Sequence, residues 1–227
     1  MTCSHRILSV DVGQRNLGVA IWEVFKKSAE SHQKPQINLA YLACHDVLTA
    51  VGCTAKCSNV TKVDSVRHLC TFLARHQHEF NVGGVTDFVV EGQVRASPKN
   101  LSLTAALFAW FTLCHTSSGR TPHMTTICAK NKFKGPLDLS DTELPKAIDK
   151  TKGAASKTKG KPKGAAYRQR KKDAVSSFEE ALACQLFTYT TTDVLSQWRS
   201  AKKKDDMADA ALQGLWYIEN KLKIKVE

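Results

Sequence analysis

The 227-residue sequence lacks any apolar run that approaches the ~20 residues of a membrane-spanning helix, so we expect no membrane partner. It is also short of negative charge: 21 Asp and Glu stand against 33 Lys and Arg, which leaves a net charge of +12. A deficit of this size favours a polyanionic partner such as nucleic acid. No internal repeat is present, and hydrophobic residues make up 42% of the chain. We therefore expect one globular domain over residues 1–227.

A strong zinc-binding pattern is also missing, although the chain has 8 cysteines. Cys53 and Cys57 have other Cys and His residues on both sides, but their spacing matches no strong zinc motif. Residues 1–6 lead directly into an apolar segment and leave no room for a secretory signal or transit peptide. We therefore expect reduced thiols and a cytoplasmic protein that is not secreted.

An apolar segment that ends in one carboxylate dominates the N-terminal region. Residues 7–12 form an apolar run with Asp11 near its end, Gly13 and Gly18 mark a turn, and a second apolar run begins at Leu17. This pattern predicts strand, turn and strand, with Asp11 at the tip of the first strand. A carboxylate buried alone is strongly disfavoured. Its position therefore predicts a bound cation and further acidic residues that share it.

The hydrophobic periodicity predicts an α/β fold. Three strand candidates in succession suggest an antiparallel meander, which helices and strands then follow in alternation. The expected strands are 6–12, 17–24, 37–45, 86–91 and 123–129, and the expected helices are 60–80, 98–115, 173–187, 193–198 and 204–222. A strand that follows a helical crossover runs parallel to its neighbour, so Asp11 and Glu91 should end adjacent parallel strands.

The last expected helix adds two acids to this set. Asp206 and Asp209 are three residues apart, so on a helix they share one face, with Cβ atoms roughly 5–6 Å apart. Asp205 is the expected N-cap. Taken alone, the pair could equally be charges that stabilise the helix N-terminus. A metal-binding role becomes the stronger interpretation together with Asp11 and Glu91.

Asp11, Glu91, Asp206 and Asp209 form a set of oxygen-only ligands, which suits Mg²⁺ or Mn²⁺. Two such ions, about 3.5–4 Å apart, can activate a water molecule and stabilise the leaving oxygen of a phosphodiester. The excess of Lys and Arg would attract the phosphates of a nucleic acid. We therefore expect these four residues to be the catalytic and metal-binding residues of a nuclease.

The segments that carry these acids resemble the RuvC-type Holliday junction resolvases of the ribonuclease H-like superfamily, and among them the branch of poxviruses and related large DNA viruses. The resemblance lies in residues 7–13, 16–18, 89–95 and 204–210, in the same order along the chain. It implies a mixed five-stranded sheet, with three antiparallel strands and then parallel ones, flanked by helices. It also implies a Mg²⁺-dependent homodimer that cuts four-way DNA junctions by paired symmetric nicks, in infected-cell cytoplasm.

The same resemblance suggests residues that contact DNA. Gln93 and Arg95 follow the second acid as they do in this branch, and we assign them to DNA contact. Lys130, Lys132 and Lys134 follow the last expected strand, and we expect them to contact phosphates or stabilise charge.

A long basic segment departs from the family pattern. Residues 150–172 contain 10 Lys or Arg and no Asp or Glu. We expect a flexible basic loop at about residues 146–172, because such a composition cannot bury a core. It would track phosphates without reading sequence. Its expected DNA contacts are Lys161, Lys163, Arg168 and Arg170.

Other functions remain open from the sequence. An actin-like ATPase or sugar kinase also begins with a strand, an Asp and a Gly turn, but it needs a second Gly-rich phosphate turn, which this chain lacks. A non-catalytic nucleic-acid binder would keep the fold without the acids. A nuclease of RNA–DNA hybrids would use identical metal chemistry. The helix at 98–115 is apolar on more sides than one sheet contact needs, which indicates either burial under a loop or a subunit interface.

Overall fold

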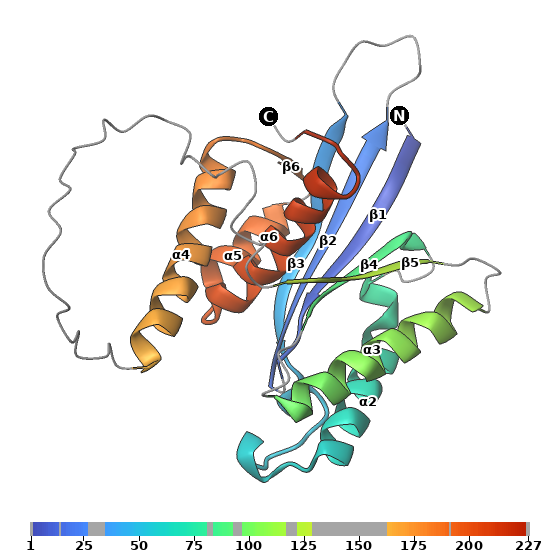
Figure 1. The fold of residues 1–227 in the computed structure, drawn as a ribbon, viewed down its shortest axis with the longest axis vertical. Helices are drawn as coiled ribbons and strands as arrows, with labels where there is room; N and C mark the ends of the chain where they lie inside the picture. The colour runs from blue at the N-terminus through green and yellow to red at the C-terminus, as the bar shows by residue number, and fades with distance from the viewer. Residues whose placement is uncertain are drawn as a thin grey trace, which may run out of the picture.

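The protein, seen in a computed structural model, has a mixed β-sheet with helices packed on both faces (Figure 1). The structure describes residues 2–13, 15–26, 35–80, 84–92, 97–116, 122–128, 163–190 and 192–225. The α/β class expected from the sequence is confirmed. None of the helices in these ranges combines the length and the apolar character that crossing a membrane requires. The cytoplasmic location stays a prediction.

The sheet has 6 strands in the order β5-β4-β1-β2-β3-β6. They are β1 (Thr2–Asp11), β2 (Asn16–Lys26), β3 (Gln36–Asp46), β4 (Asp87–Glu91), β5 (His123–Ile127) and β6 (Thr188–Tyr189). β1, β2 and β3 pair antiparallel, whereas β4 is parallel to β1 and β5 is parallel to β4. The expected count of five strands is wrong by one. β6, which pairs parallel with β3, has only 2 residues, too few for an alternating pattern to mark it.

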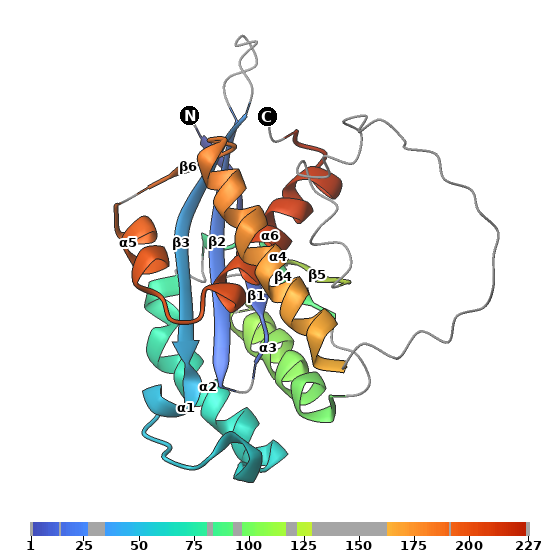
Figure 2. The ribbon, with the colours of Figure 1, turned by 90° about the vertical axis from the view of Figure 1, so that its left-hand side faces the viewer.

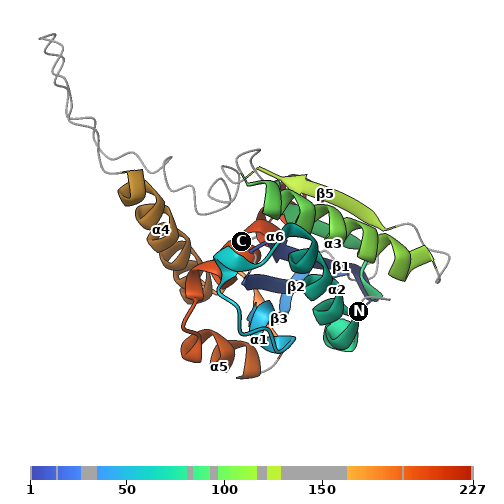
Figure 3. The ribbon, with the colours of Figure 1, turned by 90° about the horizontal axis from the view of Figure 1, so that it is seen from below.

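Two helix layers cover the sheet, α2 and α3 on one face and α4, α5 and α6 on the other (Figure 2). The helices are α1 (Val47–Ala50), α2 (Lys62–Phe80), α3 (Pro98–Thr116), α4 (Lys163–Ala183), α5 (Thr192–Ser200) and α6 (Lys204–Asn220), with a 3₁₀ turn at Cys57–Asn59. Each helix expected from the sequence is present. The view from below shows α2 and α3 side by side (Figure 3).

β1 divides its side chains between the two layers because successive side chains of a strand point to opposite faces. Leu8 and Val10 pack in the core under α2 and α3, whereas Ile7 packs in the core under α6. The α6 face allows an unusually close approach. A Cβ atom at Gly214 of α6 would lie 2.4 Å from the Trp22 ring, so only glycine fits there. Odd-numbered residues of β1 therefore face α6.

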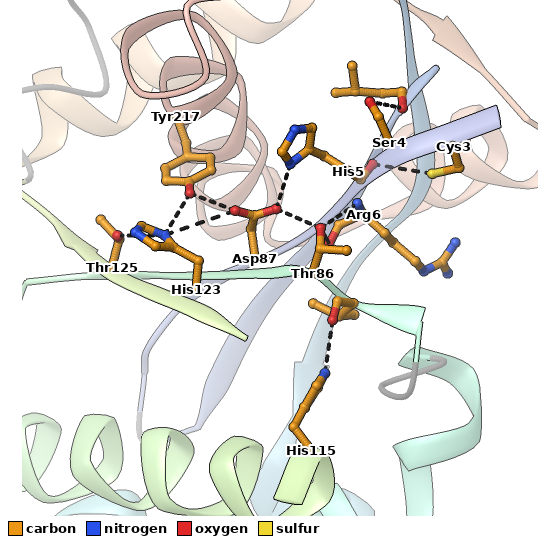
Figure 4. Close-up of polar contacts among 12 residues, drawn as sticks. Cys3, Ser4, His5, Arg6, Thr86, Asp87, His115, His123, Thr125 and Tyr217 are labelled. Atoms are coloured by element: carbon orange, nitrogen blue, oxygen red, sulfur yellow. Dashed lines mark hydrogen bonds and ion pairs between the residues drawn. The ribbon is translucent and has the colours of Figure 1, made fainter. Parts of the chain in front are cut away.

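A buried carboxylate holds the C-terminal half of α6 to the sheet (Figure 4). Asp87, at the start of β4, is 4% exposed. Its Oδ1 accepts a hydrogen bond from the Tyr217 hydroxyl of α6 at 2.8 Å, and its Oδ2 accepts one from Thr86 Oγ1 at 2.6 Å. His5 Nδ1 lies 3.0 Å from Oδ2, and His123 Nδ1 lies 2.9 Å from the Tyr217 hydroxyl. This cluster joins β1, β4, β5 and α6 at the amino ends of the parallel strands.

The structure corrects the extent of the basic loop expected at residues 146–172. Residues 163–172 form the first half of α4. Lys and Arg are good helix formers, and the helix is fixed further along by Ala174, Phe178 and Ala181, which are buried in the core. The basic segment thus continues a helix that is anchored further along the chain. Residues 146–162 lie outside the described residues.

α3 keeps an apolar stripe on its solvent side. Leu103, Leu107 and Phe111 are buried against the sheet. Residues spaced by four lie on the same side of a helix. The solvent side of α3 has four exposed apolar residues with this spacing, Leu101, Ala105, Ala109 and Leu113. Leu113 is 71% exposed, so the described part of the chain leaves most of its side chain uncovered.

Candidate active site

Asp11 and Glu91 end neighbouring parallel strands. Asp11 is the last residue of β1, and Glu91 is the last residue of β4. The register between the strands ends with Val10 opposite Val90, so the next position on each strand is an acid. The alternation of side chains puts both acids on the α6 face, and both are half-buried. Their expected position at adjacent strand ends is confirmed.

The first turn of α6 lies directly against the strand beside Asp11. Gly18 of β2 pairs with Asp11 in the antiparallel register. A Cβ atom at Gly18 would lie 2.1 Å from the backbone oxygen of Asp206 and 3.4 Å from Cβ of Asp11. Glycine is therefore required for this approach of helix to sheet. The contact brings Asp206, which is 8% exposed, to the strand end that carries Asp11.

A buried glutamine determines where the next acid of α6 lies. Gln213 Nε2 donates hydrogen bonds to the carbonyl oxygens of Val10, at 3.3 Å, and Val89, at 3.2 Å, so it bridges β1 and β4. Asp209 lies four residues earlier on the same face of the helix. It is therefore one helical turn, about 5.4 Å, closer to the acidic ends of the two strands.

The four predicted acids thus come from β1, β4 and α6 to one edge of the sheet. Carboxylate oxygens are the donors that Mg²⁺ and Mn²⁺ prefer, so the chemistry of the donor set fits the expected metal. Within the described ranges, however, no three His, Cys, Asp or Glu side chains converge closely enough to hold a metal ion. The same finding gives no support to a zinc site at Cys53 and Cys57.

A lysine that the sequence did not single out lies among these acids. Lys171 of α4 donates hydrogen bonds to the carboxylate of Asp205 and, at 2.9 Å, to Oδ1 of Asp206. Burial opposes the charge of the ammonium, but the two carboxylates outweigh it and raise the pKa of Lys171. The expected N-cap role of Asp205 is wrong: Lys203 stands at the N-cap, and Asp205 instead contacts Lys171. In the sequence, Lys171 stands within a run of basic residues, and no pattern distinguishes it from its neighbours.

The thiol of Cys44, on β3, lies near the same acids. Cys44 lies opposite Gly18 in the register of β2 and β3. Burial, followed by the negative charges of Asp206, Asp205 and Asp11, raises the pKa of Cys44 to about 12. A thiol with such a pKa stays protonated at neutral pH and is a poor nucleophile. Carboxylates from β1 and α6 therefore lie within electrostatic range of this one half-buried thiol.

The structure describes only some of the predicted DNA contacts. Arg168 and Arg170 are exposed on α4, just before Lys171, and Lys163 is the first residue of that helix. Because Lys171 contacts the first turn of α6, this basic part of α4 lies beside the acids. The other predicted contacts lie outside the described residues: Gln93, Arg95, Lys130, Lys132, Lys134 and Lys161.

No protein-family model matches this sequence, and no curated protein sequence is significantly similar to it. Solved structures do match its fold. The yeast mitochondrial Holliday junction resolvase Ydc2 aligns with a TM-score of 0.60 and 15% identity, over 98% of this chain and 82% of that protein. The Fowlpox virus resolvase, solved with substrate Holliday junction DNA, aligns with a TM-score of 0.50 and 18% identity, over 96% of this chain and 99% of that protein.

These similarities establish the fold. The chain has the ribonuclease H-like fold found in Holliday junction resolvases, as the motif resemblance implied. They do not select a branch, because a yeast mitochondrial protein and a viral protein both align over almost the whole chain. The placement in the poxvirus branch stays a prediction.

Proposed function

We propose that this chain, which shares its fold with Holliday junction resolvases, is a metal-dependent endodeoxyribonuclease that cuts four-way DNA junctions by paired symmetric nicks. The observation that carries the proposal is that Asp11 and Glu91 end adjacent parallel strands and that α6, which carries Asp206 and Asp209, packs its first turn against the same strand ends. A net charge of +12 supports a nucleic-acid substrate.

In this proposal the four carboxylates hold two Mg²⁺ ions, which Mn²⁺ can replace. Bound Mg²⁺ would activate a water molecule and neutralise charge on the phosphodiester. The chain itself supplies rigid placement. Strand ends position Asp11 and Glu91, and the close contact at Gly18 positions Asp206. Lys171 donates a hydrogen bond to the Asp206 carboxylate and so orients it.

Basic residues around this edge would carry the DNA backbone. Arg168 and Arg170 lie on α4 beside Lys171, where they can neutralise phosphates near the cut. Glu91 and Ile127 are the last residues of the parallel strands β4 and β5, so the chain leaves both strands at the same edge of the sheet. The DNA contacts proposed for residues 93–95 and 130–134 follow those strand ends directly.

A homodimer would supply two active sites, one for each nick. The apolar stripe of α3 is the surface of the described chain that best suits a symmetric, self-complementary interface. A monomer with this stripe in water would expose apolar surface without benefit. We therefore propose that α3 packs against α3 of a second copy.

Two rival functions share parts of this pattern. A nuclease of RNA–DNA hybrids would use the same acids, and substrate shape alone would distinguish it. An actin-like ATPase or sugar kinase would use the turn after Asp11 to hold phosphate. That function gives no role to Glu91, Asp206 and Asp209 together, so the nuclease accounts for more of the site.

The full-length protein should be incubated with a synthetic four-way junction, a linear duplex and an RNA–DNA hybrid, each with Mg²⁺, Mn²⁺ or EDTA. We expect symmetric nicks in the junction alone, and only with a divalent cation. Cutting of the hybrid but not of the junction would move the function to a hybrid nuclease. ATP hydrolysis without any cutting of nucleic acid would reject the proposal.

A further inference from the structure

A pocket of about 410 Å³ lies beside the turn that joins β1 to β2. Arg15 lines one side, and Thr49 of α1 with residues 52–56 lines much of the rest. The N–H of Val47 donates to the carbonyl oxygen of Arg15 at 2.8 Å and ties the turn to α1. β1 and β3 are both antiparallel to β2, so α1 follows β3 at the edge where β1 ends. The pocket therefore opens at the same end of the molecule as the candidate active site.

The guanidinium that lines this pocket is already oriented. Arg15 Nε donates to Oδ2 of Asp46 at 2.7 Å, and Oδ1 of Asp46 accepts from the backbone N–H of Thr49 at 3.1 Å. One carboxylate thus holds both the arginine and the start of α1. Arginine has five N–H donors in a planar fork, so the contact at Nε leaves the terminal nitrogens as further donors. A planar, pre-oriented fork suits two oxygens of a phosphate.

The surroundings of the pocket are positively charged. Lys56 lines it together with Arg15. Arg75 of α2 donates to the carbonyl oxygen of Ala50 at 3.2 Å, between the pocket residues Thr49 and Gly52. Lys99 of α3 donates to the carbonyl oxygens of Cys57, at 3.5 Å, and Val60, at 2.6 Å, which lie one and four residues after Lys56. Two cations therefore line the pocket and two more contact its flanking backbone, and among the described residues Asp46 is the acid paired with Arg15.

We propose that this pocket binds one phosphate of the nucleic-acid strand that enters the active site. The inference rests on the proposed function and extends it to a second contact point on the backbone. Arg15 follows Asp11 by four residues, which span at most ~14 Å even when fully extended. That backbone span corresponds to about four nucleotides at a rise of ~3.4 Å each, and the Arg15 side chain extends it, so the bound phosphate lies a few nucleotides from the cut. The hydroxyls of Thr49 and Thr54 add hydrogen-bond donors at the pocket wall.

Lys56 offers a direct test because it lines the pocket and belongs to no part of the acid site. In an Asp11→Asn background, Lys56→Ala should weaken binding of a four-way junction about three- to ten-fold and reduce the slope of log K against log salt by about 0.9. Lys221→Ala is the matched control, because Lys221 is an exposed lysine at the C-terminal end of α6, whereas the acids lie at its N-terminal end. Equal effects of the two substitutions would overturn the inference.

Cys53, which also lines the pocket, gives a readout that does not depend on cutting. Saturating junction DNA should slow its alkylation by iodoacetamide several-fold, while the exposed Cys3 at the start of β1 reacts at an unchanged rate. Unprotected Cys53 in a DNA-bound protein would contradict the inference. If the protein binds no DNA, the proposed function fails, and the pocket is then tested with inorganic phosphate. Protection of Cys53 by phosphate would support a phosphate-binding pocket, and lack of protection would reject it.

Discussion

At the scale of single residues, the proposed active site depends on four carboxylates. Asp11→Asn, Glu91→Gln and Asp209→Asn should each reduce junction cutting by roughly 10²–10³-fold or more, because each removes a charge that the metal ions need. Junction binding should stay close to that of the unchanged protein, because basic residues supply it. Rates of cutting and gel-shift affinities measure the two effects.

Asp193→Asn is the matched control for these substitutions. Asp193 is an exposed acid at the start of α5, away from the strand ends. Its substitution should leave both cutting and binding unchanged. Cutting at the full rate by any of the three site variants would remove that residue from the metal-binding set.

Lys171 is a cation that the structure places in direct contact with the first turn of α6. Its side chain is 23% exposed and the Asp206 side chain is 12% exposed, so Lys171→Met would leave two carboxylates without their partner. We expect a loss of about 1 kcal/mol in the free energy of unfolding, after allowing for solvent screening. Added Mg²⁺ should recover that loss, which denaturant unfolding with and without the metal can measure.

Lys172→Met provides the comparison, since Lys172 is exposed on the same helix. It should change neither stability nor the response to Mg²⁺. A loss of stability for Lys171→Met that Mg²⁺ does not recover would mean that Lys171 acts only as a structural partner of the acids.

At the scale of elements, α6 decides the geometry of the site because it is fixed at both ends. Its first turn contacts Gly18, and Tyr217 near its end donates to Asp87. Tyr217→Phe should lower the free energy of unfolding by about 1–3 kcal/mol, because the buried carboxylate loses a hydrogen bond. Tyr189→Phe, at an exposed position of β6, should have no such effect in the same thermal or denaturant unfolding. Equal stabilities of the two variants would show that the Asp87 cluster does not hold α6.

The contact between β3 and α2 introduces a dependence of stability on pH. Tyr41 OH and His45 Nε2 lie 2.8 Å apart, and burial, followed by the charge of His76, lowers the pKa of His45 to about 4. The unfolded chain therefore binds this proton at a higher pH than the folded chain does. Stability is complete above pH ~6.5 and falls as the pH drops toward 4, by on the order of 2–3 kcal/mol.

His45→Gln tests this source of acid sensitivity, because Gln cannot titrate but can still accept from the Tyr41 hydroxyl. Its free energy of unfolding between pH 6.5 and pH 4 should fall less than that of the unchanged protein. Parallel curves for the two proteins would show that His45 does not titrate in this range and that other groups cause the acid loss.

At the scale of the whole molecule, the proposed dimer makes the exposed stripe of α3 the surface to test. Leu113→Glu should raise the dimer dissociation constant by about 10- to 100-fold, because burying a leucine contributes ~1.5–3 kcal/mol. Light scattering after size exclusion measures the change. Val63→Glu is the control, because Val63 of α2 is similarly exposed, at 68%, outside the stripe. A protein that is monomeric before any substitution would contradict the proposed interface.

The resemblance of the motifs anticipated the architecture of the whole molecule, and the structural neighbours match it. The four acids could be identified from the sequence because each stands at a position that a short-range sequence pattern indicates. Asp11 and Glu91 close apolar runs, and Asp206 and Asp209 share a helix face. The prediction of a loop at residues 163–172 was wrong for the opposite reason. These residues are helical because core contacts of residues further along α4 fix the helix.

The sequence by itself determined the five longer strands, the five longer helices apart from the first half of α4, and the side of each that carries an acid, because those properties repeat with periods of two and 3.6 residues along the chain. Only the tertiary structure decided which side chains from distant segments of the chain meet. Lys171 on Asp206, Cys44 beside the acids, Gln213 between β1 and β4, and Arg15 at the pocket are contacts between distant segments. Local periodicity carries no information about such contacts, since packing of the sheet against its helices is what brings those side chains together.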